Sequence, residues 1–293
     1  MRFAEIQLRI ASMQELRRIV SALRALASMR MQQAAHTIPS VRQYGAAIAS
    51  AIEDTLPLLP ERPAALAPAR GGRRALILCT SEQGFVGSFN EQLFEAAARE
   101  LRGEALFVLG TRGRALAEGR GWKLAWSDRA ATRVASLTEA VARLASELYR
   151  AIARNEVTSA QVIFARYGHG TLAKIERRPL FPLDLARSSP SPVRAAPLHH
   201  LPPAVLLEKL VAEYVFALLS EAAIETLASE NAARFNAMGA AQDNLARKLG
   251  QLEQQAGEAR QEEVTTELLD LVTGAEAAGC MTSSPAAVFE MGM

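Results

Sequence analysis

The sequence has 293 residues, 49% of them hydrophobic and 5% aromatic, and a formal net charge of +2 at pH 7. This length allows one large or two ordinary domains, and the near-neutral charge does not favour a nucleic-acid or membrane-surface binder. The two cysteines, Cys79 and Cys280, match no metal spacing. Two cysteines in a chain of this size do not make a disulfide scaffold, so a reduced, cytosolic setting is favoured.

The N-terminal residues are charged at Arg2, Glu5, Arg9 and Glu15, where a secretory signal needs an apolar run. No stretch of about 18 uninterrupted apolar residues occurs in the sequence. We therefore expect no signal peptide and no membrane span, and a protein that is soluble or at most peripheral to a membrane.

Apolar residues recur at helical spacing from the start of the chain, and polar residues fill the opposite face. Pro39 should kink this helix or mark a short break, and Pro57 and Pro60 should end it. The sequence thus predicts a first domain, residues 1–60, made of one long amphipathic helix. Its apolar positions are Ile6, Ile10, Met13, Leu16, Ile19, Val20, Leu23, Leu26 and Met31.

A linker rich in proline and glycine follows at 61–72, and beyond it strand-like and helix-like segments alternate. The strand-like segments are 73–80, 105–110 and 160–167, with a further extended piece within 171–183. The helix-like segments are 91–101, 111–118 and 137–154. This alternation favours a small Rossmann-like α/β domain with a largely parallel sheet, which we place at 73–187.

Residues 204–284 contain no proline, whereas Pro202, Pro203 and Pro285 flank them. Because proline is tolerated near a helix start and cannot continue a helix, this stretch predicts a single long helix. We assign 204–278 to a C-terminal helical domain and 279–293 to a tail. A helix of roughly 70 residues, at about 1.5 Å per residue, is on the order of 100 Å long, so it must protrude and needs an extended partner.

Residues at alternating spacings of three and four give the C-terminal helix a coiled-coil seam. The N-terminal helix is the simplest partner for it, because it is the other long amphipathic helix that the sequence predicts. We therefore expect a long antiparallel coiled coil of the two terminal helices, with the α/β domain inserted between them. The seam contains Phe235, Met238, Leu245, Leu249 and Leu252, interrupted by the polar residues Asn231 and Gln242.

Charge is unevenly distributed along the chain. Eleven arginines and no lysine lie between Met1 and Arg74, and seven acidic residues lie between Gly250 and Glu276. The two ends could attract each other, or each could meet a different partner.

The arginines of the first helix could bind nucleic acid, although no aromatic residue is interleaved with them. A solvated helix face explains them as well, and so does a surface that meets acidic loops of a protein partner. A nucleic-acid binder or coiled-coil scaffold that used these arginines would bind DNA with a strong salt dependence. The arginines concerned are Arg9, Arg17, Arg18, Arg24 and Arg30.

The loop Gly84-Phe85-Val86-Gly87-Ser88 follows a strand and precedes a helix, which is the context of a phosphate cradle. It matches neither G-x-G-x-x-G nor the Walker pattern, so a tight turn is the better interpretation.

His199 and His200 have no third metal ligand nearby, and no nucleophile motif occurs. We expect no catalytic, cofactor or metal site, whereas an enzyme built on the α/β insert would bind nucleotide through residues 73–185.

The chain resembles the gamma subunit of F-type ATP synthases, the central rotor shaft, over nearly its whole length. The similar segments are 5–31, 80–90 (TSEQGFVGSFN), 225–234 (ETLASENAAR) with Ala237-Met238, and 259–275. The resemblance is loose from 101 to 201. Two departures suggest a divergent branch, such as an alternative synthase with altered ion coupling. The family usually reads Asp-Arg-Gly-Leu-Cys-Gly-Gly where this chain has 82–88, and most members lack the residues beyond Ala278.

The resemblance implies a shaft without an active site or cofactor, which turns inside a ring of alternating alpha and beta subunits. It implies coupling of ion flow, of protons or sodium ions, to ATP synthesis or hydrolysis. The implied partners are the alpha and beta subunits, the epsilon subunit and the membrane c-ring, with no nucleic acid. The implied location is the cytoplasmic face of a bacterial inner membrane.

Four residues match positions at which family members contact the beta subunit: Arg30, Arg260, Gln261 and Thr265. The alternative for each is a solvated flank position of the coiled coil, because many surface charges contribute little.

Overall fold

The computed structural model describes residues 3–59, 72–168, 173–183 and 198–281. The chain forms two compact units: residues 23–238 make the larger one, and residues 1–22 with 239–293 make the smaller one. Each long terminal helix contributes residues to both units. The domain boundaries predicted from the sequence follow the secondary-structure elements and not these two units. The predicted domains are 1–60, 73–187, 204–278 and 279–293. The two divisions differ because the inner parts of both helices pack against the α/β sheet.

Helix α1 runs from Phe3 to Thr55 and is followed by a 3-10 turn at Leu56–Leu58. Pro39 lies inside α1. Of the two outcomes expected there, a kink or a short break, the break does not occur. Proline removes one backbone hydrogen bond and crowds the preceding turn. Burial of the neighbouring residues Ala34 and Ile38 in the core offsets this cost.

The sheet has five strands in the order β3-β2-β1-β4-β5. The first four are parallel, and β5 pairs antiparallel with β4, so the sheet is largely parallel as predicted. Edge strand β3 was not predicted from the sequence, because it reads LAWSD and has no apolar run. The strands are β1 Arg73–Cys79, β2 Ala105–Leu109, β3 Leu124–Asp128, β4 Val157–Arg166 and β5 Lys174–Phe181.

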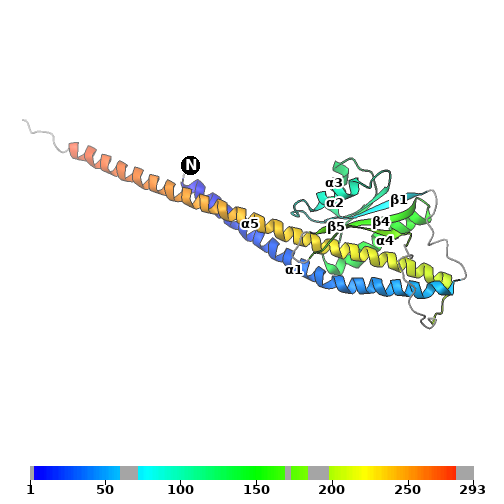
Figure 1. The fold of residues 1–293 in the computed structure, drawn as a ribbon. Helices are drawn as coiled ribbons and strands as arrows, with labels where there is room; N and C mark the ends of the chain where they lie inside the picture. The colour runs from blue at the N-terminus through cyan, green and yellow to red at the C-terminus, as the bar shows by residue number, and fades with distance from the viewer. Residues whose placement is uncertain (1–2, 60–71, 169–172, 184–197, 282–293) are drawn as a thin grey trace, which may run out of the picture. The chain divides into compact units, whose positions relative to one another are not determined.

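Helices cover both faces of the sheet (Figure 1). One face packs against α2 (Phe89–Ala98) and α3 (Thr111–Gly119). The other packs against α4 (Leu137–Ala153), which follows a 3-10 turn at Val134–Ser136, and against parts of α1 and α5 (Pro203–Met281). Alternate residues of β1 enter the two cores, Ile77 on the α4 and α5 side and Leu76 and Leu78 on the other. The predicted helix 204–284 is therefore α5, and its last three residues lie outside the described ones.

Helices α1 and α5 pair antiparallel. Near the start of α1, Ile6 and Ile10 pack with Leu249 and Ala256 of α5. Further along α1, Tyr44 donates a hydrogen bond to Glu213 of α5. Residues with higher numbers in α1 contact residues with lower numbers in α5, so the two helices run in opposite directions. This confirms the predicted fold class.

The predicted seam positions differ in burial. Met238, Leu245 and Leu249 are buried, whereas Phe235 and Leu252 are half-buried. The guanidinium of Arg24 lies 4.6 Å from the ring centroid of Phe235, at cation–π distance. Across the described residues, no helix has both the length and the apolar character needed to cross a membrane.

Candidate partner-contacting surface

The loop from Ser81 to Ser88, here called the anchor loop, is fixed to the α/β domain by Glu82. Its carboxylate accepts hydrogen bonds from the backbone N–H groups of Thr111, at 3.0 Å, and Ala130, at 2.9 Å. It also accepts one from Thr111 Oγ1 at 2.6 Å. Thr111 is the first residue of α3, so the carboxylate occupies the helix N-terminus where a phosphate could otherwise bind. These bonds hold the start of the loop against α3, whereas the end of the loop leads into α2 at Phe89, so the tight-turn interpretation of residues 84–88 stays a prediction.

The anchor loop is also bonded to α5 through Arg234. This guanidinium donates to the carbonyl oxygens of Gly84, at 3.1 Å, and Gln83, at 3.2 Å. It also forms an ion pair with Glu230 at 2.7 Å, and both side chains are almost fully buried. Burial raises the pKa of Glu230, and the neighbouring Arg234 opposes that shift. This pair was not predicted from the sequence, although its spacing of four residues within a helix was a usable signal.

Arg30 lies beside the anchor loop and donates a hydrogen bond from Nη1 to Gln83 Oε1 at 3.3 Å. It lines a groove that also contains Leu26, Phe85 and Met238. Phe85 is 72% exposed and has a backbone φ of 60°, so the turn presents its ring outward. Arg30 was predicted from the sequence as a contact residue and Phe85 was not, because the exposure of Phe85 depends on the turn conformation.

Arg260, Gln261 and Thr265 are exposed on α5, in the other compact unit. Thr265 Oγ1 donates to the carbonyl oxygen of Gln261 at 2.8 Å, so this hydroxyl is partly committed to its own helix. The structure thus brings Gln261 and Thr265 together, while Arg30 belongs to a separate surface. Large apolar side chains lie exposed in the same part of α5: Val264, Leu268, Leu269, Leu271 and Val272.

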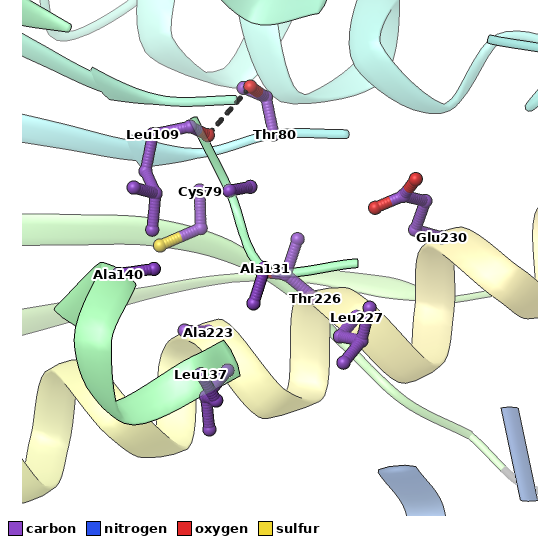
Figure 2. Close-up of a pocket in the computed structure, with 11 residues that line it drawn as sticks. Cys79, Thr80, Leu109, Ala131, Leu137, Ala140, Ala223, Thr226, Leu227 and Glu230 are labelled. Atoms are coloured by element: carbon purple, nitrogen blue, oxygen red, sulfur yellow. Dashed lines mark hydrogen bonds between the residues drawn. The ribbon is translucent and has the colours of Figure 1, made fainter. Parts of the chain in front are cut away.

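A small cavity lies between the end of β1 and α5 (Figure 2). Cys79 and Thr80 line it from the sheet, and Thr226 and Glu230 line it from α5. Thr80 Oγ1 donates to the carbonyl oxygen of Leu109 at 2.9 Å. Burial raises the pKa of the Cys79 thiol to about 12, so the sulfur is protonated at neutral pH and is a poor nucleophile.

Metal binding finds no support in the described part of the chain, where no group of three or more His, Cys, Asp or Glu side chains converges. His199 Nδ1 lies 2.9 Å from the carbonyl oxygen of Leu201 in its own turn. His169 lies outside the described residues. The fold is that of two long antiparallel helices with an α/β domain inserted between them in the sequence.

Comparisons with known proteins give the family. A family model described as ATP synthase matches residues 2–278. The chain is 28% identical over 291 residues to the ATP synthase gamma chain of Solibacter usitatus (strain Ellin6076), covering 94% of this chain and 98% of the relative. It is 25% identical over 279 residues to the ATP synthase gamma chain of Geobacter sp. (strain M21), covering 92% and 96%.

The fold is also similar to that of a chain in the Euglena gracilis mitochondrial ATP synthase, solved as an OSCP/F1/c-ring assembly in rotational state 3. The TM-score is 0.67 at 13% identity, with 99% of this chain and 98% of that chain covered. This chain belongs to the ATP synthase gamma family. A gamma subunit is a non-catalytic part of the synthase, in agreement with the expectation from the sequence.

Proposed function

We propose that this chain is the central rotor shaft of a rotary F-type ATP synthase. In this role α1 and α5 transmit torque between a membrane-embedded ion-translocating c-ring and a catalytic hexamer of alpha and beta subunits. The observation that carries the proposal is the family match over residues 2–278, together with the pairing of Ile6 and Ile10 with Leu249 in a coiled coil. Two helices packed along a seam resist bending and twisting better than one helix.

The exposed apolar end of α5 supports a protein partner. Val264, Leu268, Leu269, Leu271 and Val272 are between 47% and 70% exposed. A contiguous apolar surface of this kind is unfavourable in water and marks an interaction site. We assign it to the inner surface of the alpha and beta ring.

Arg260, Gln261 and Thr265 lie next to that apolar surface, and we propose that they contact the beta subunit. Arg30 is proposed to contact a beta subunit from the groove beside Phe85, since its Nη1 bond to Gln83 leaves further guanidinium donors for a carboxylate.

The epsilon subunit and the c-ring are the proposed partners of the α/β domain. The whole would be peripheral to the cytoplasmic face of a bacterial inner membrane. The coupled ion is a proton or sodium ion, whose ligands belong to the ring.

The proposal is tested by co-expression of the chain with the alpha and beta subunits encoded in the same genome. We expect size-exclusion chromatography with mass analysis to find one copy in a complex with three alpha and three beta subunits. ATP hydrolysis by that complex should depend on the chain. Absence of the chain from every such complex would overturn the proposal.

The beta-subunit contact is tested by Arg260→Ala. Loss of one charge-assisted contact of about 1 kcal/mol should weaken assembly roughly fivefold, because a tenfold change in affinity corresponds to about 1.4 kcal/mol. The matched control is Arg154→Ala, which removes an exposed arginine of the α/β domain. Equal assembly of both variants, measured by titration of the chain into alpha and beta subunits, would contradict the assignment of Arg260.

A further inference from the structure

The α/β domain meets α5 through a largely apolar helix face. Its buried side chains include Ala222, Ala223 and Ala228 beside the larger Leu219, Ile224 and Leu227. Hydrophobic packing is non-directional, and alanine forms only low ridges. Directional bonds between this face and the sheet therefore add a resistance to rotation of the helix about its own axis that packing alone does not specify.

Two carboxylates of α5 supply such bonds. Glu225 has a fully buried side chain, and its Oε2 accepts a hydrogen bond from the backbone N–H of Tyr167, at the end of β4, at 2.7 Å. Its Oε1 pairs with Arg42 of α1. Glu221, one turn earlier, accepts from Arg42 Nε at 3.2 Å and from Arg178 Nη1 of β5 at 2.5 Å. We call this group of contacts the polar junction.

The arginine on the sheet side of the polar junction is itself held in place. Arg178 donates from Nη2 to Glu176 Oε1 at 2.8 Å, and its guanidinium lies 5.1 Å from the ring centroid of Phe164. One turn beyond Glu225, Ser229 Oγ donates to the carbonyl oxygen of Ala165 at 3.0 Å. Glu221, Glu225 and Ser229 are spaced four residues apart, so they lie along one face of α5 and bond it to β4 and β5 at successive turns.

We propose that Glu221 and Glu225 are positioning residues that fix the rotational register of α5, and with it α1, relative to the α/β domain. The inference rests on the proposed rotor function and specifies where torque passes from the α/β domain to the shaft. Buried ion pairs add little net stability, because desolvation offsets their attraction, but a wrong arrangement leaves buried charges unpaired. The polar junction therefore selects one orientation of the shaft without greatly strengthening the fold.

The test uses the assembled complex with the catalytic hexamer immobilised and a probe attached to the α/β domain. Angular fluctuations of the probe on a stalled rotor report the torsional stiffness of the path through the polar junction. The variant is Glu221→Met with Glu225→Met, which keeps side-chain length and removes both carboxylates as hydrogen-bond acceptors. We expect the angular variance to rise about twofold, because non-directional packing and the single Ser229 bond then carry the load.

The matched control is Asp128→Asn with Glu139→Gln. It removes the two carboxylates that pair with Arg143 inside the α/β domain and leaves the polar junction intact. A second control, Leu144→Ala, lowers the melting temperature through a core cavity. Both controls should keep the wild-type variance, which separates register from stability.

Each outcome decides the inference. If the angular variance of the Glu221 and Glu225 variant equals that of the controls, the inference is overturned. Rotation of the wild-type complex in the same experiment would still support the proposed function. A wild-type complex that does not rotate overturns the proposed function itself. If the double variant fails to assemble, Arg178→Met removes the arm of the junction on the sheet side, and its variance decides by the same criterion.

Discussion

At the residue scale, buried or half-buried carboxylates determine how the loops of the α/β domain are held. Glu82 accepts three hydrogen bonds from α3 and from the segment after β3. Glu118, by contrast, makes an exposed pair with Arg114 on the same helix, at 2.9 Å. The two acidic residues are alike in chemistry and differ in burial and in the number of their partners.

This difference gives a stability prediction. Glu82→Ala should lower the free energy of unfolding by about 1–2 kcal/mol, because it removes the charged acceptor at the start of α3. Glu118→Ala should change it by about 0.5 kcal/mol or less, as is usual for an exposed helix pair. Chemical denaturation of both variants measures the difference. Equal changes in the free energy of unfolding for the two variants would contradict the anchoring role of Glu82.

Tyr149 gives a pH prediction at the same scale. Burial, with a smaller contribution from Glu213, raises its pKa to about 12. Its hydroxyl donates to the carbonyl oxygen of Ala212 at 2.5 Å. Because the unfolded chain releases this proton at lower pH, the stabilisation is fully present below about pH 10 and is lost as pH rises toward 12.

Tyr149→Phe should therefore lower stability at pH 8 by about 1 kcal/mol through the lost hydrogen bond. Between pH 10 and 12 its stability should fall less steeply than that of the wild type. Denaturant unfolding across this pH range makes the comparison. Identical slopes for the two proteins would rule out Tyr149 as a contributor.

At the element scale, α5 has two environments along its length. Leu249 is 5% exposed and packs with Ile6 and Ile10, whereas Leu268 is 57% exposed. Leu249→Ala should lower the free energy of unfolding of the isolated chain by about 2–3 kcal/mol, and Leu268→Ala should change it by about 0.5 kcal/mol or less. Leu268→Ala should instead weaken assembly with alpha and beta subunits. The opposite ranking in either assay would contradict the assignment of these two faces.

Continuity of α5 is tested by Leu249→Pro. Proline in a helix interior costs about 3 kcal/mol or more and breaks or kinks the helix. We expect ATP turnover to become uncoupled from ion transport in membrane vesicles that carry this variant. Normal coupled pumping would count against a shaft that works through an unbroken helix.

The elements also show which parts of the structure a sequence can predict. The long helix from 204 was predicted correctly as far as Met281, where the described part of α5 ends, because proline placement and seam spacing are local signals. Edge strand β3 was not predicted, and the choice between a kink and a break at Pro39 stayed open, since burial by distant residues decides both. Glu82 and the polar junction were also missed. Arg42 and Glu225 are 183 positions apart, and no local pattern pairs them.

At the scale of the whole molecule, the family match covers residues 2–278, and the fold joins an α/β domain to a pair of antiparallel helices. The residues proposed to contact beta subunits, Arg30 and Arg260, lie in different compact units. A shaft that presents separate surfaces along its length can meet several partners at once. Alone, the exposed apolar end of α5 should make the isolated chain prone to association.

The measurement that tests the central claim most directly is ATP-driven rotation. The complex is immobilised through its beta subunits, and a probe is attached to the α/β domain of this chain. The rotor account predicts continuous rotation in one direction that stops when ATP is withdrawn. A complex that hydrolyses ATP while the probe shows only undirected fluctuation would contradict it.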